Sequence, residues 1–181
     1  VMDLGSTKQE ICQALDSLPA NTRAIGGHPM CGKEISGIEQ AEPGLYRDKV
    51  FALVPTQRTD TGTLQLAVEL VRTIGARPLM LQAAQHDRLA TAISHLPYLA
   101  AAGLVRAAEQ VSITEPLVWD LAASGFRDST RLAASDLTMM LDIVLTNRDA
   151  ILDSLERFTR ELELLRQAVT NRDVDALYHL L

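Results

Sequence analysis

The sequence predicts an α/β segment over residues 1–82 followed by an all-α segment over residues 83–181. In the first segment, short apolar runs that end at proline or glycine alternate with amphipathic stretches, as strands alternate with helices. In the second segment the strand pattern is absent, and apolar residues recur every three or four positions. Aromatic residues make up only 4% of the chain, so aliphatic side chains must build its core.

The first segment is expected to hold two helices and three strands. Ser6 and Gln9 have the spacing of a capping box and predict the start of the first helix. Asp60 is a predicted N-cap for the second helix, which Gly75 ends. A glycine-punctuated loop is expected over residues 28–45. Because helices alternate with strands, a mostly parallel sheet is predicted. In chain order the expected helix, two strands, helix and strand cover residues 7–18, 23–27, 50–55, 61–74 and 77–82.

The second segment is expected to be a helix bundle. Its longest apolar stripe predicts one long helix with a kink near Asn147, and Asn171 and Asp173 are predicted to cap a short final helix. Such a stripe is longer than a small domain covers alone, so a homodimer is expected. The expected helices cover residues 86–93, 98–110, 115–123, 141–169 and 174–181.

Composition excludes several classes of protein. The formal net charge of −6 argues against a nucleic-acid partner. No apolar run approaches the ~18 residues of a membrane span, and the first twenty residues lack the apolar core of a secretory signal. Cys12 and Cys31 form no disulfide framework, which favours a cytoplasmic location. The opening residues 1–8 read as a strand end, a turn and a helix start, so a preceding segment is expected.

The most unusual stretch is Gly-Gly-His-Pro-Met-Cys-Gly at residues 26–32. Its glycines allow a close backbone approach, and Pro29 favours an extended His28 whose ring projects from the carboxyl end of a strand. Open α/β sheets bind ligands at that edge. The alternative is a turn histidine with no chemical role. A metal site or a thiol nucleophile with Cys31 is disfavoured, since no second ligand pair lies nearby in the sequence.

Three further groups carry polar side chains that could act on a ligand. Ser6 follows another predicted strand end and could orient the ring of His28; otherwise it is only a helix cap. His95 lies between two helices, where it could line a site or simply cap carbonyls. Arginines and an aspartate at residues 125–131 suit a carboxylate ligand, or form solvated surface charge. The pair His86-Asp87 is interpreted as an ordinary helix N-terminal turn.

Together these motifs resemble the prephenate/arogenate dehydrogenase family of tyrosine biosynthesis. The glycine-histidine-proline-methionine block and the phenylalanine-arginine-aspartate block are jointly specific, whereas either one alone is weak. The resemblance covers almost the whole chain and implies the C-terminal half of a Rossmann-like nucleotide-binding domain, followed by a helical dimerisation domain. The matching blocks lie in order at residues 3–8, 26–32, 86–87, 94–97 and 125–136.

The resemblance implies the oxidative decarboxylation of prephenate to 4-hydroxyphenylpyruvate with NAD or NADP. His28 is implied to accept the proton of the 4-hydroxyl while hydride leaves for the nicotinamide, and Ser6 to hydrogen-bond His28. Arg131 is implied to pair with the ring carboxylate of the substrate, in a pocket that His95 lines. The remaining implied substrate-binding residues are Arg127, Asp128 and Thr130, and the implied cofactor-binding residues are Ser6, Pro29 and Met30. No metal is implied.

The chain departs from the family pattern at several points. It contains no Gly-x-Gly-x-x-Gly turn to hold a pyrophosphate, so the choice between NAD and NADP stays open and the chain alone is expected to be inactive. Tyr98 stands where relatives often carry a second histidine, and residues 137–140 replace a run that often contains tryptophan. The alternatives are an arogenate dehydrogenase and a non-catalytic dimerisation or regulatory module. A β-hydroxyacid dehydrogenase is disfavoured, because such enzymes more typically use a lysine base.

Overall fold

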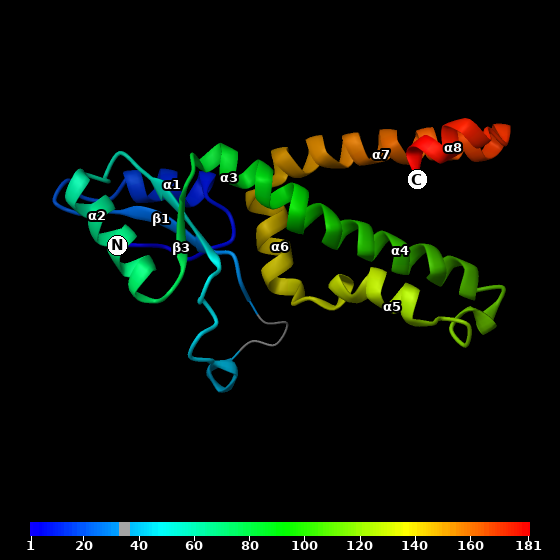
Figure 1. Cartoon of the computed structure of the whole chain (residues 1–181), viewed down its shortest axis with the longest axis horizontal. Coiled ribbons are helices and arrows are strands. Elements are labelled where there is room, and N and C mark those ends of the chain that lie inside the picture. The colour runs from blue at the N-terminus through cyan, green and yellow to red at the C-terminus, as the bar shows by residue number, and fades with distance from the viewer. Residues whose placement is uncertain (33–36) are drawn as a thin grey trace.

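The computed structural model describes residues 1–32 and 37–181, so part of the loop expected over residues 28–45 lies outside the described residues. A three-stranded sheet with helices α1 (Gln9–Asp16) and α2 (Thr61–Thr73) forms the N-terminal part. Only helices and helical turns follow from residue 83 onward in the chain. Figure 1 shows the sheet at one end of an elongated molecule and the longer helices extending from it. The predicted class, α/β followed by all-α, is therefore confirmed.

The sheet has the order β1-β2-β3, with strands Ile25–Pro29, Val50–Pro55 and Arg77–Met80. Strands β2 and β3 are parallel, but β1 and β2 are antiparallel, so the prediction of a mostly parallel sheet was wrong for that pair. A parallel pair needs a long crossover, usually a helix. Helix α2 provides one between β2 and β3, whereas the described residues between β1 and β2 contain only the short turn η1 (Ile38–Gln40).

The core of the α/β part lies between the sheet and helix α2. Leu53 of β2 and Val71 of α2 are fully buried, and Phe51 is almost so. Six buried residues form this cluster: Ile25, Phe51, Leu53, Ala67, Val71 and Ala76. Helix α2 begins as predicted, because a carboxylate oxygen of Asp60 accepts a hydrogen bond from the Thr63 amide at 2.8 Å.

The first helix does not begin as predicted. Ser6 makes no capping hydrogen bond to α1 in the structure, and the capping box with Gln9 was wrong. The side chain of Asp87, from a distant segment, accepts from the amides of Lys8 and Gln9 at 2.7 and 2.8 Å. A tertiary contact has therefore replaced the local cap, and the carboxylate lies against the positive end of the helix dipole.

The helical part begins with α3 (Ala83–Ala90), which continues through a π-helical turn, η2 (Thr91–His95), into α4 (Leu96–Ser112). The helix expected over residues 115–123 was wrong, because only the turn η3 (Pro116–Val118) forms there and α5 starts later, at Ser124–Thr130. Hydrogen bonds such as Asp120 N to Leu117 O at 3.1 Å close tight turns instead. The remaining elements are η4 (Arg131–Ala134), α6 (Leu137–Thr146), α7 (Arg148–Asn171) and α8 (Val174–Leu180).

The long C-terminal apolar stripe is split where the sequence predicted a kink. Helix α6 ends before Asn147, which is buried, and α7 begins directly after it. Asp173 caps α8 as predicted, accepting from the Ala176 amide at 2.9 Å, but the prediction for Asn171 was wrong, because Asn171 is the last residue of α7. In Figure 1, α4 and α7 both run away from the sheet, and α8 folds back along α7. None of the helices described is long and apolar enough to cross a membrane.

Candidate active site

His28 lies near the carboxyl end of β1, opposite Ala52 of β2. The preceding residue must be glycine, because a Cβ atom on Gly27 would lie 2.7 Å from the carbonyl oxygen of Asp3. The amide of Gly27 also donates to the carboxylate of Asp3 at 3.1 Å. The close approach of these two segments therefore fixes the backbone from which the His28 ring projects.

A chain of hydrogen bonds runs from His28 into the protein. His28 Nδ1 lies 2.8 Å from His86 Nε2, and the two ring centroids are 5.0 Å apart. His86 Nδ1 lies 2.8 Å from Asp87 Oδ1. Asp87 is fully buried and His86 is 2% exposed. The Asp87 carboxylate that caps α1 thus also anchors the ring that contacts His28.

The pair His86-Asp87 was interpreted from the sequence as an ordinary helix turn, and that interpretation was incomplete. The two residues do lie in the first turns of α3, but their side chains point to β1 and α1 rather than capping their own helix. The available signal was that this pair is one of the blocks that carry the family resemblance.

His95 ends the π-helical turn and is 1% exposed. Its Nδ1 atom lies 3.1 Å from Asn147 Nδ2, the amide nitrogen at the break between α6 and α7. Asn147 Nδ2 also donates to the carbonyl oxygen of Asp87 at 3.0 Å. Because a carbonyl oxygen only accepts, this contact identifies the amide nitrogen, which then also faces His95. The same nitrogen also donates to the Thr91 hydroxyl at 2.8 Å, so its two N–H groups face three acceptor positions and do not by themselves fix the tautomer of His95.

Both histidines are uncharged at neutral pH. Burial, together with the neighbouring His86, Lys8 and His95, lowers the pKa of His28 from 6.5 to about 4 against the opposing effect of Asp3. Burial also lowers the pKa of His95 to about 4, although Asp87 opposes this shift. A neutral imidazole can accept a proton at one nitrogen and donate from the other.

The structure does not pair Ser6 with His28. Among the hydrogen bonds of the described residues none joins these two side chains, and His28 Nδ1 contacts His86 instead. Pro29 ends β1, and the Met30 amide donates to the Val50 carbonyl at 2.8 Å. Met30 also lines an apolar cavity of about 250 Å³, together with Ala52, Leu79, Leu81, His86, Leu89 and Ile93.

The predicted carboxylate-binding residues lie on a separate part of the molecule. Arg127 and Asp128 are exposed on α5, and Arg131 is exposed at the start of η4. Thr130 is half-buried and donates from its hydroxyl to the Phe126 carbonyl at 2.7 Å. Both α5 and η4 pack against α4, which extends from the sheet end of the molecule (Figure 1).

Thiol and metal chemistry find little support in the structure. Burial raises the pKa of the Cys12 thiol to about 11 and raises that of Cys31 above its ordinary value. Both therefore disfavour the reactive thiolate. Within residues 1–32 and 37–181, no three His, Cys, Asp or Glu side chains group as a metal site would require.

Comparison with known proteins gives the family. Residues 1–80 match the family described as "Prephenate dehydrogenase, nucleotide-binding domain", and residues 82–181 match "Prephenate dehydrogenase, dimerization domain". The chain belongs to the prephenate dehydrogenase family. A prephenate dehydrogenase of Bacillus subtilis (strain 168) is 36% identical over 179 residues, which cover 98% of this chain and 48% of that protein. One from Lactococcus lactis is 34% identical over 181 residues, 99% of this chain and 49% of that protein.

Solved structures of prephenate and arogenate dehydrogenases share the fold. Prephenate dehydrogenase from Aquifex aeolicus aligns with a TM-score of 0.91 and 30% identity, over 99% of this chain and 63% of that chain. Synechocystis arogenate dehydrogenase aligns with a TM-score of 0.87 and 30% identity, over 99% of this chain and 65% of that one. The chain spans about half the length of the curated prephenate dehydrogenases it matches.

Two places in the α/β part could receive a dinucleotide, the N-terminus of α1 and the carboxyl end of β1, and they differ in how well they fit one. Helix N-termini often bind phosphate, but the first amides of α1 already donate to Asp87, and the Lys8 ammonium is buried against Asp3. The Asp87 carboxylate thus occupies the place at the N-terminus of α1 where a phosphate would bind. The carboxyl end of β1, with an uncharged His28 followed by Pro29 and Met30, is compatible with the cationic ring of an oxidised nicotinamide.

Proposed function

We propose that this protein catalyses the NAD(P)-dependent oxidative decarboxylation of prephenate to 4-hydroxyphenylpyruvate, with His28 as general base. The observation that supports the proposal is the uncharged His28 near the carboxyl end of β1, whose Nδ1 lies 2.8 Å from His86 Nε2. The family supports the reaction, because the matched nucleotide-binding domain and the relatives' names describe such dehydrogenases.

In the proposed reaction, His28 Nε2 takes the proton of the substrate's 4-hydroxyl as the C–H bond at that carbon breaks. When bound, the dinucleotide supplies the acceptor for the departing hydride. The bond to the ring carboxylate then breaks, CO₂ leaves, and its electron pair completes the aromatic ring of a phenolate, whose oxygen takes the proton back from His28. His95 is proposed to carry its proton on Nε2, to donate from it to an oxygen of the substrate and so to orient the ring.

Substrate carboxylates are proposed to bind the arginines of α5 and η4. Prephenate is a dianion, and a protein of net charge −6 needs local positive charge to bind it. We assign Arg131 to the ring carboxylate, because a guanidinium matches a carboxylate with two parallel hydrogen bonds. Arg127, Asp128 and Thr130 are proposed to line the same pocket.

Ser6, Pro29 and Met30 are proposed to contact the nicotinamide end of the cofactor. Ser6 lies in the turn before α1, and Pro29 and Met30 directly follow His28. With cofactor and substrate bound, the Ser6 side chain is proposed to turn toward His28. NAD-type chemistry is supported by a solved relative from Aquifex aeolicus in complex with hydroxyphenyl propionate and NAD+, which aligns at 31% identity with a TM-score of 0.90.

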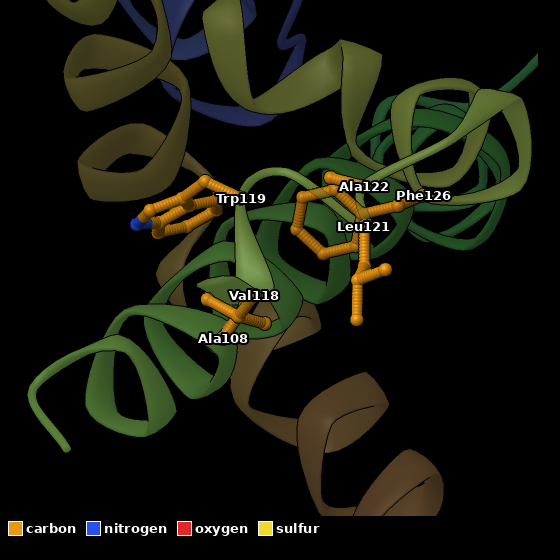
Figure 2. A pocket seen from close by; sticks show the side chains of 6 residues that line it. All are labelled: Ala108, Val118, Trp119, Leu121, Ala122 and Phe126. Atoms are coloured by element: carbon orange, nitrogen blue, oxygen red, sulfur yellow. The ribbon is translucent and has the colours of Figure 1, made fainter. Parts of the chain in front are cut away.

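The proposed active form is a cytoplasmic homodimer built through the helical part. Support comes from the matched dimerization domain and from large apolar side chains left exposed on the helices. Figure 2 shows one such place, an apolar pocket of about 220 Å³ whose wall includes Trp119, Leu121 and Phe126. The aromatic rings of Trp119 and Phe126 meet edge to face at 6.2 Å but leave Trp119 45% exposed. A second copy would cover such a surface.

Turnover assays on the full-length gene product test the proposal. Prephenate and arogenate are each supplied with NAD+ and with NADP+, and reduced nicotinamide and CO₂ are measured together. We expect equal amounts of both products with prephenate. Faster turnover of arogenate would favour the second candidate, which the Synechocystis structure supports. No turnover in any combination would overturn the proposal in favour of a non-catalytic module.

A further inference from the structure

Asp87 is connected to both candidate site histidines, His28 and His95, through one intervening residue each. Its carboxylate contacts His86, which contacts His28. Its carbonyl oxygen accepts from Asn147, which faces His95. We propose that Asp87 and His86 are positioning residues that fix the tautomer of His28, so that Nε2 is the nitrogen left to accept the substrate proton. Only the role of His28 Nε2 as the acceptor of the substrate proton rests on the proposed function.

The carboxylate of Asp87 sets the direction of the chain of hydrogen bonds. Its oxygens accept from two backbone amides, those of Lys8 and Gln9, at 2.7 and 2.8 Å. Both amides are donors only, and an ionised carboxylate is an acceptor only. The third contact, from His86 Nδ1 at 2.8 Å, must therefore also be a donation to the carboxylate.

The donation from His86 to Asp87 also determines which nitrogen of His28 carries the proton. In the proposed arrangement His86 carries a single ring proton, on Nδ1, so its Nε2 carries a lone pair and accepts. The atom 2.8 Å away is His28 Nδ1, which therefore carries the proton of that ring. His28 Nε2 is then unprotonated. The other neutral tautomer of His86 would turn a lone pair of its Nδ1 toward the Asp87 carboxylate, a repulsive contact inside the protein.

Burial makes this arrangement selective. His86 and Asp87 are 2% and 0% exposed, so water cannot replace a lost partner at low cost. In free imidazole the proton moves readily between the two nitrogens, and an exposed histidine has no fixed tautomer. A histidine whose partner is itself held by a carboxylate keeps one tautomer, as the hydrogen-bond partner of a ring nitrogen decides which nitrogen is protonated.

The backbone carbonyl oxygen of Asp87 holds Asn147, the residue that contacts His95. It accepts from Asn147 Nδ2 at 3.0 Å and from the Thr91 hydroxyl at 2.8 Å. Asn147 is thereby held with its amide nitrogen toward His95 Nδ1. Asp87 therefore contacts the partners of both histidines, His86 through its carboxylate and Asn147 through its carbonyl oxygen. The proposal concerns the tautomer of His28 alone.

The test combines histidine NMR and kinetics on the full-length gene product. Nitrogen-15 spectra of labelled imidazoles at neutral pH report which nitrogen of each ring is protonated, and His28→Asn assigns the His28 signal. We expect wild-type His28 to be protonated on Nδ1. His86→Leu should abolish that preference, whereas His86→Gln, whose amide oxygen can still accept from His28, should partly restore it. His179→Gln on exposed α8 is the matched control.

The kinetic variants separate positioning from a merely structural role. In His86→Leu and Asp87→Asn we expect kcat for prephenate to fall about 10- to 100-fold with KM changed little, and His86→Gln should lie between these and the wild type. A lowered melting temperature with unchanged kcat below it would overturn the proposal. If His86→Leu fails to fold, the wild-type and His86→Gln spectra still decide.

The same data distinguish the relay from the proposed function. A wild-type His28 protonated on Nε2 overturns the relay whatever the enzyme turns over. Conversely, a wild-type His28 protonated on Nδ1, with this preference lost in His86→Leu, supports the relay even if prephenate proves not to be a substrate. In that case only the proposed function fails.

Discussion

Two regions of the molecule differ in how far contacts within the chain bury their side chains. Around β1 and α3, His86, Asp87 and His95 are at most 2% exposed and linked by hydrogen bonds. Along the helical part, Leu121 is 81% exposed and Leu145 67% exposed. The side-chain contacts of the histidine network are thus made within one copy, with Asn147 Oδ1 the buried atom that has no partner among the described residues. The helical faces are proposed to be covered by a second copy, and the exposed arginines to bind the substrate carboxylates. The predictions below probe this contrast, from the largest expected effect to the smallest.

Among the tests of this contrast, the largest effect is expected at an exposed arginine. Arg131→Ala should leave a substrate carboxylate without its partner and raise KM by a factor that corresponds to about 2–5 kcal/mol. Steady-state kinetics with prephenate measure it, and Arg157→Ala, which removes an exposed α7 arginine paired with Asp153, is the control. If Arg131 serves only the fold, thermal stability falls instead and KM stays unchanged.

The contrast in burial predicts a contrast in stability. Leu53→Ala removes a fully buried side chain from the core of the sheet and should cost about 2–5 kcal/mol of the free energy of unfolding. Leu121→Ala removes an exposed one and should cost less than about 1 kcal/mol in a monomer. Denaturant unfolding at low protein concentration compares them. Equal costs would mean that the helical face is already covered within one copy.

Local and tertiary determinants explain which features the sequence could predict. The strand Val50–Pro55 and the caps Asp60 and Asp173 depend on neighbouring residues, and these three predictions were confirmed. The irregularity predicted near Asn147 is also present, but as a break between two helices rather than a kink in one. The antiparallel β1–β2 pair depends on how the chain returns between those strands, which local patterns do not encode.

The candidate site shows the same division. His28 and His95 could be singled out because glycine, proline and helix boundaries surround them in the sequence. The contact between His28 and His86 joins residues 58 positions apart, and Asp87 caps a helix that starts 78 positions earlier. Neither partner could be chosen from spacing alone, and so Ser6 was expected in both roles, as the cap of α1 and as the partner of His28.

The apolar helix faces predict the oligomeric state. Leu145→Lys, on exposed α6, should weaken the dimer, because a buried unpaired charge in an apolar interface is costly. Leu66→Lys, equally exposed on α2 at 67%, is the matched control and should leave the dimer intact. Light scattering over a dilution series compares them. A wild-type monomer at micromolar concentration, or dissociation by Leu66→Lys alone, would contradict this view of the helical part.

The smallest effect is a pH dependence of stability. The pKa values of His28 and His95 are lowered from 6.5 to about 4 in the folded state, so the unfolded chain binds protons first as the pH falls. Their contribution to stability is therefore present above pH 6.5 and is lost progressively toward pH 4. Denaturation at pH 7 and pH 5 measures the loss, which should shrink in His28→Asn. An unchanged pH dependence in that variant would mean that the His28 side chain is solvated and has an ordinary pKa in the folded protein.

The central claim, that His28 is the base, is tested most directly by kcat of His28→Asn in the full-length gene product across pH 6–9. Asparagine keeps hydrogen-bonding groups of similar reach but cannot take the hydroxyl proton as the hydride departs. The account predicts that kcat with prephenate falls about 10²- to 10⁴-fold at every pH, with only a modest change in KM. Near-normal kcat over that pH range would show that another group accepts the proton, and would contradict the assignment of His28.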